Sequence, residues 1–126
     1  MSGSRDAVYE GEVSGRVARH GVEEFGFDVD TGVTVEYAFR VRSGPNADVV
    51  VVDAANMATW RAGTATSYYS HLSALDVRDA SRSGSLPAGE YVVAVDNTAM
   101  GQARPPLTGS DDAAAVVFDL RYVVSR

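Results

Sequence analysis

The sequence contains no cysteine and no lysine, and all 11 of its basic residues are arginine. Without cysteine the chain has no disulfide, no thiolate nucleophile and no thiolate metal ligand. No apolar run approaches the roughly 18 residues that cross a membrane as a helix, and no charged-then-apolar signal segment opens the sequence. A sustained helical stripe is also missing. The sequence therefore predicts a strand-rich protein without thiol chemistry or a membrane-inserted segment.

Positive charge is scarce relative to negative charge. The chain has 17 acidic and 11 basic residues, which gives a net charge of −6 at pH 7. An acidic surface repels phosphate groups, so nucleic acid and anionic membranes are poor partners. The lack of lysine, together with many Val, Ala, Asp and Gly residues, is typical of GC-rich genomes and gives a halophile-like composition.

The length of 126 residues is close to that of one ordinary domain. We expect residues 1–6 to form a flexible N-terminus and residues 7–126 to form a single domain. A chain of this size buries about two-thirds of its unfolded surface, so it needs no disulfide or metal to fold. We expect no cofactor.

Alternation of apolar and polar residues is the main structural signal. Residues 33–41 and 116–124 each alternate strictly, as half-buried antiparallel strands do. Residues 48–52 and 91–95 are apolar on both faces, which is typical of central strands covered on both sides. These patterns predict an all-β fold of antiparallel sandwich type.

Glycine and aromatic positions suggest how the first strands pair. A three-residue loop after Arg19 pairs Val17 with Phe25 and places the ring of Phe27 over Gly15. With a similar loop further on, residues 8–41 are predicted to form a three-stranded meander.

That second loop spans residues 30–32, and Gly32 is expected to adopt the left-handed conformation that such loops need. A weaker strand is predicted at residues 75–80. Longer loops are predicted at about 54–72 and 98–112.

From residue 33 onward the order of features resembles a known class of module. The resembling segments are the alternating strand 33–41, the run Ala47–Asp53, the segment Leu86–Asn97 and the closing strand 116–124. Together they resemble bacterial β-sandwich modules of the pre-peptidase C-terminal and GOLD-like kind. The resemblance implies a jelly-roll-like sandwich of about eight strands, which serves as an accessory or interaction module outside the cell, at its surface or within an assembly.

The loop at 54–72 is the predicted binding surface, because aromatic and arginine side chains gather there and such residues dominate interfaces. The candidate contact residues are Asn56, Trp60, Arg61, Tyr68, Tyr69 and His71. The same rings could stack on a sugar. Alternatively, Trp60 and one tyrosine cap the open end of the sandwich.

Three patterns could carry chemistry. Asp30-Thr31-Gly32 spells the tripeptide of aspartic proteases, which need two such carboxylates across a dimer, but it also suits a hairpin loop. His20 and His71 are too far apart in sequence for the usual zinc spacing, so solvated positions are expected.

The third pattern is a set of oxygen ligands that follow the two buried strands. Asp53, Asp96 and Asn97, with Asp111 and Asp112 further on, could bind calcium or could simply form turns. No Gly-x-Ser-x-Gly elbow or glycine-rich phosphate loop is present.

The leading interpretation is a non-catalytic protein that acts through contacts with another protein or with itself, as an accessory, surface or assembly component. The first alternative is a carbohydrate-binding module that uses Trp60, Tyr68 and Tyr69. The second alternative is a dimeric aspartic protease that uses Asp30.

Overall fold

A computed structural model describes residues 7–64 and 66–126, and the predicted flexible segment 1–6 lies outside the described residues. In chain order the elements are β1 (Ala7–Val17), β2 (Val22–Val29), β3 (Val33–Ser43), β4 (Ala47–Asp53), α1 (Ala54–Arg61), the 3-10 helix η1 (Ser70–Leu72), β5 (Ala74–Val77), β6 (Asp79–Leu86), β7 (Gly89–Asp96), α2 (Asp111–Ala114) and β8 (Val116–Ser125). No helix among the described residues is long and apolar enough to span a membrane.

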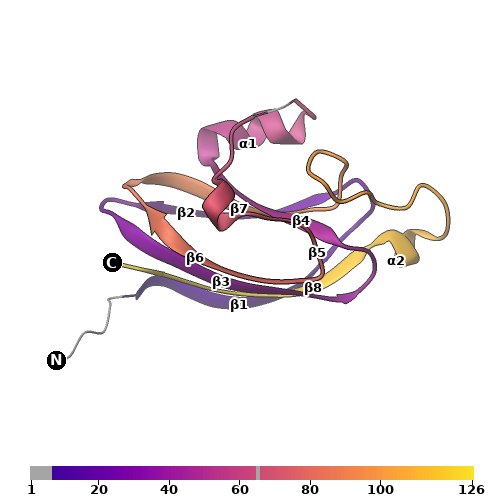
Figure 1. Ribbon diagram of the computed structural model, residues 1–126, viewed down its shortest axis with the longest axis horizontal. Helices are drawn as coiled ribbons and strands as arrows, with labels where there is room; N and C mark the ends of the chain where they lie inside the picture. Colours follow the sequence, from indigo (N-terminus) through magenta and orange to yellow (C-terminus); the bar gives the residue numbers. More distant parts are fainter. Residues whose placement is uncertain (1–6, 65) are drawn as a thin grey trace.

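The strands form two antiparallel sheets of four strands each, packed face to face (Figure 1). Sheet A has the order β1-β8-β3-β6, and sheet B has the order β2-β7-β4-β5. Every connection crosses from one sheet to the other except the one between β4 and β5, as in a double-sheet jelly roll. The predicted all-β sandwich with about eight strands is therefore confirmed.

The predicted N-terminal meander is wrong. β1 pairs with β8, β2 pairs with β7, and β3 lies between β8 and β6. No two of the first three strands therefore pair with each other. Val17 lies opposite Val116, and Phe25 lies opposite Val93. Strands that face each other across the core bury the same kind of side chain as strands that pair, so the apolar pattern could not separate the two arrangements.

The conformation predicted for Gly32 is also wrong, because the connection between β2 and β3 steps between the sheets instead of closing a hairpin. Its φ is not positive, whereas His20 in the connection between β1 and β2 has a φ of 64°. The left-handed conformation was predicted for a hairpin between β2 and β3, and the fold does not contain that hairpin.

The main core lies between the sheets, and Phe39 and Phe118 are its largest fully buried side chains. An aromatic ring over a glycine does occur, with partners other than those predicted. The ring of Phe118, not of Phe27, lies against Gly15, and the ring of Tyr122 lies against Gly11. Aromatic side chains of β8 thus cover the glycines of the edge strand β1, where no side chain is present.

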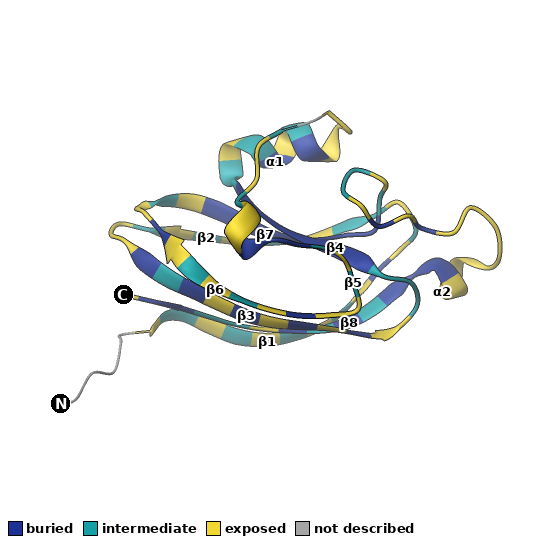
Figure 2. Ribbon diagram, in the orientation of Figure 1, coloured by how far each residue is buried: buried dark blue, intermediate teal, exposed yellow. Residues whose placement is uncertain are grey.

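The outer face of sheet B carries a second apolar cluster. Val50 and Val52 of β4 and Val92 of β7 pack beneath Met57 and Trp60 of α1. This confirms that the two doubly apolar segments are covered on both sides. It also shows that the predicted loop at 54–72 contains a helix, which the sequence did not reveal because only two of its eight residues are buried. Among the described residues, no helix covers the outer face of sheet A, and residues along its strands are exposed (Figure 2).

Candidate functional site

The predicted contact residues at 54–72 are divided between packing and surface roles. Trp60 is 4% exposed, and its indole N–H donates to the Asp96 carboxylate at 3.1 Å. It packs on the outer face of sheet B, not at the open end of the sandwich. Tyr69 is half-buried and donates from its hydroxyl to Asp53 at 2.6 Å. The hydrogen bonds of these two side chains attach residues 54–72 to the ends of β7 and β4.

The remaining predicted contact residues lie nearer the surface. Arg61 donates to both carboxylate oxygens of Glu24 and so ties α1 to β2. Tyr68 is 39% exposed and meets Trp60 edge-on. Asn56 is half-buried, and His71 is exposed. The structure therefore does not bring Trp60, Tyr68 and Tyr69 together as an open stacking platform.

Among the predicted calcium ligands, the carboxylates of Asp53 and Asp96 accept hydrogen bonds within the protein, whereas the buried Oδ1 of Asn97 accepts none from the described residues. Asp96 accepts from Trp60 and from the backbone N–H and hydroxyl of Thr98. The Asn97 amide donates to backbone carbonyls at the end of β1 and at the end of α2. Across residues 7–64 and 66–126, no group of three or more His, Asp or Glu side chains could hold a metal ion.

Asp30 and the two histidines lie in separate surface positions. The Asp30 side chain is 90% exposed in the connection between β2 and β3, 3.9 Å from the guanidinium of Arg126. His20 is exposed in the connection between β1 and β2. The ring of His71 lies over Gly84, with Nε2 3.1 Å from the carbonyl oxygen of Ser85.

Among the large hydrophobic side chains of residues 7–64 and 66–126, the most exposed lies in the second long loop. This loop, residues 97–110 between β7 and α2, we call the β7–β8 loop. Leu107 is 82% exposed, twice as much as Tyr68. The loop extends past the end of the two sheets beside α2, and its outer part is exposed (Figures 1 and 2). Figure 2 thus contrasts this loop with α1, which packs its buried side on sheet B.

The outer part of the β7–β8 loop is held by Arg19. Its guanidinium donates to the carbonyl oxygens of Gly109 at 2.9 Å, Ser110 at 3.2 Å and Leu107 at 3.4 Å. The Arg19 side chain is only 17% exposed and lies 3.9 Å from the carboxylate of Asp111. Gly109 has a φ of 93°, a conformation that favours glycine.

The inner part of the loop is held by Asp48, which is fully buried. Its carboxylate accepts from the backbone N–H groups of Ala103 at 3.0 Å and Gln102 at 3.2 Å, and also from Asp76 at 2.7 Å. Burial raises the pKa of Asp48, and these N–H donors lower it in part. A Cβ on Gly101 would lie 2.2 Å from a carboxylate oxygen, so only glycine fits there.

Together these contacts make the β7–β8 loop an ordered support for one protruding leucine. Sequence reasoning recognised residues 98–112 as a long loop but missed the roles of Arg19 and Leu107. The signal that was available is an apolar residue after Pro105-Pro106 in a polar stretch. The bracing could not be found, because Arg19 and Gly109 are 90 residues apart in the sequence.

No protein-family model matches the sequence, and no curated protein matches it in a sequence search. Among solved structures, the chain is similar to PliG of Aeromonas hydrophila, described as a periplasmic lysozyme inhibitor of g-type lysozyme. The TM-score is 0.51 at 12% sequence identity, over 99% of this chain and 91% of that chain. The similarity at this level of identity concerns the fold.

Proposed function

We propose that this protein is a non-catalytic β-sandwich that acts by binding another protein through the β7–β8 loop. The observation that carries the proposal is Leu107, 82% exposed on a backbone that Arg19 holds in place. Burying a leucine side chain in a partner contributes about 1.5–3 kcal/mol. A loop that is ordered before binding loses little conformational entropy when it binds, so more of that energy appears as affinity.

Two further observations support a partner of a particular kind. The net charge of −6 favours association with a basic protein, because opposite charges steer the encounter. The similar fold of PliG belongs to a periplasmic inhibitor of a lysozyme. We therefore take a lysozyme as the first candidate partner and the cell envelope or the exterior as the proposed location. The resemblance to pre-peptidase C-terminal and GOLD-like modules stays a prediction, and it implies the same kind of role.

The test is inhibition of lysozymes in a bacterial cell-lysis assay, combined with calorimetric titration. We expect the wild-type protein to inhibit a g-type lysozyme and Leu107→Asp to weaken binding at least about tenfold, the equivalent of about 1.4 kcal/mol. Tyr68→Asp is the matched control, because it places the same charge at the other exposed large apolar residue and should leave binding unchanged.

The outcomes separate the parts of the proposal. If Leu107→Asp binds as tightly as the wild type, the loop is not the contact surface. If no lysozyme is bound or inhibited, a lysozyme is not the partner.

A further inference from the structure

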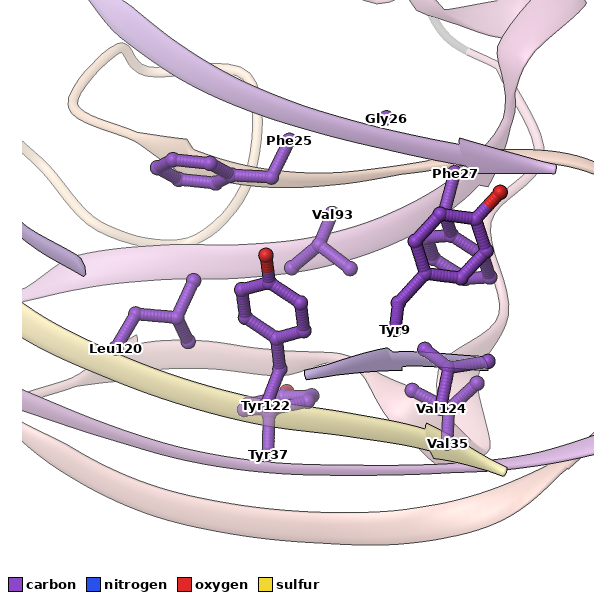
Figure 3. A pocket seen from close by; sticks show the side chains of 10 residues that line it. All are labelled: Tyr9, Phe25, Gly26, Phe27, Val35, Tyr37, Val93, Leu120, Tyr122 and Val124. Carbon is purple, nitrogen blue, oxygen red and sulfur yellow. The ribbon is translucent and has the colours of Figure 1, made fainter. Parts of the chain in front are cut away.

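An apolar cavity of about 30 Å³ lies between the two sheets, away from the β7–β8 loop. It is near the side where β1 and β2, the edge strands of sheets A and B, face each other. Figure 3 shows its lining: Phe25, Phe27 and Val93 come from sheet B, and Leu120 and Val124 are among those from sheet A. Apart from tyrosine hydroxyls, these side chains offer hydrocarbon surface only.

The rim of the cavity is formed by half-buried aromatic side chains, including Tyr9, Phe27 and Tyr122. Tyr9 donates from its hydroxyl to the backbone carbonyl and the carboxylate of Asp28, at 2.9 Å in each case, and so connects β1 to β2. The hydroxyl of Tyr122 lies over Gly11, where the edge strand has no side chain. Within the described part of the chain, no hydrogen bond involves that hydroxyl.

The size of the cavity limits what it can hold. A volume of about 30 Å³ leaves room for a group of about the size of a water molecule, but a water needs two or more polar partners. The walls offer only tyrosine hydroxyls, and those of Tyr9 and Tyr37 already donate to other groups of the protein. A single methyl or methylene group fits better. A longer apolar chain could place its end in the cavity and lie across the rings of Tyr9, Phe27 and Tyr122.

The charge around the rim limits the head group. The Asp28 carboxylate accepts a hydrogen bond from the rim residue Tyr9 and is exposed at the edge of sheet B. An anionic head group would be repelled there, whereas a cationic one would be attracted. A neutral hydroxyl or ammonium group could bond to the Tyr122 hydroxyl.

We propose that this cavity binds the tail of a single-chain amphiphile with a cationic or neutral head group, which the hydroxyl of Tyr122 contacts. The site is independent of the proposed partner-binding loop, so either proposal can fail alone.

The test is a titration followed by methyl NMR with three probes of equal tail length: octylammonium, 1-octanol and octanoate. We expect saturable shifts of the Val93 and Leu120 methyl signals, with octanoate binding at least about tenfold more weakly than octylammonium at low salt and less so at high salt. Val93→Leu adds one methylene where the cavity lies and should weaken all binding at least tenfold. Val123→Leu, on the exposed face of β8, is the matched control and should change nothing.

Tyr122→Phe keeps the ring and removes the hydroxyl, so it should weaken 1-octanol several-fold even if Val93→Leu fails to fold. Absence of saturable shifts with all three probes, or unchanged affinity in both Val93→Leu and Tyr122→Phe, would overturn the site. Equal affinity for octanoate and octylammonium would overturn the head-group preference.

Discussion

The indole N–H of Trp60 donates a hydrogen bond of 3.1 Å to the carboxylate of Asp96, and both residues are buried. The bond joins α1 to the end of β7, the strand that carries part of the apolar cluster beneath the helix. The same carboxylate holds Thr98 at the start of the β7–β8 loop. One buried acid therefore links the covered face of sheet B to the exposed loop.

Trp60→Phe should lower the free energy of unfolding by about 1–3 kcal/mol, because a buried acceptor that loses a donor keeps its desolvation cost. Urea denaturation measures this change. Tyr68→Phe, which removes a hydroxyl from the neighbouring exposed ring, is the control and should stay within about 0.5 kcal/mol of the wild type. A Trp60→Phe protein as stable as the control would show that the bond contributes nothing.

Gly15→Ala should destabilise the protein by about 1–3 kcal/mol, because the core is already filled at this position. The added Cβ would lie 2.8 Å from a ring carbon of Phe118, which is fully buried and cannot easily move. Gly26→Ala is the matched control in another edge strand, where the nearest atom would be 3.8 Å away. Thermal unfolding should separate the two variants, and equal melting temperatures would contradict the packing argument.

Ionisation of the buried Asp48 carboxyl should make the free energy of unfolding depend on pH. Burial raises the pKa of its carboxyl above the ordinary value of 3.8. A group with a raised folded-state pKa contributes stability that is complete below its unfolded-state pKa and is lost as the pH rises through the folded-state pKa. Asp48→Asn keeps the Oδ1 acceptor for the backbone N–H groups but cannot ionise.

We therefore expect the unfolding free energy of the wild type, relative to Asp48→Asn, to fall as the pH rises above the ordinary carboxyl pKa of 3.8. Urea titrations at several pH values measure the difference. A difference that grows with pH would mean that the backbone N–H donors outweigh burial.

Arg19→Met should loosen the β7–β8 loop with little effect on the two sheets, because the lost bonds are to loop carbonyls. Hydrogen bonds from a charged donor contribute about 1.5–3 kcal/mol, so local opening should become at least about tenfold more frequent. Chymotrypsin cleavage after Leu107 reports this opening. Arg121→Met, on the exposed face of sheet A, is the control, and equal cleavage rates in the two variants would exclude Arg19 as the brace.

Much of the fold could be predicted because strand alternation is a local property. Val35, Phe39 and Phe118 are buried as their patterns indicate, and the doubly apolar β4 and β7 are covered on both sides. The pairing could not be predicted, since Gly15 meets Phe118 from the far end of the chain.

The candidate site was predicted only in part. The loop at 98–112 was recognised, whereas the predicted loop at 54–72 contains α1 and η1. Residues 54–72 received the binding role because of their aromatic side chains. Packing of α1 on sheet B buries Trp60, and bracing by Arg19 leaves Leu107 exposed. Residue type alone does not distinguish a ring that packs from one that binds.

By itself the sequence determined the strand-rich character of the protein, the side of most strands that faces the core, and its acidic charge. These follow from a two-residue period and from composition, which each segment carries without its neighbours. Only the tertiary structure decided which strands pair, which long loop packs and which stays exposed. Those outcomes depend on contacts between distant residues, such as Arg19 with Gly109, that no local pattern encodes.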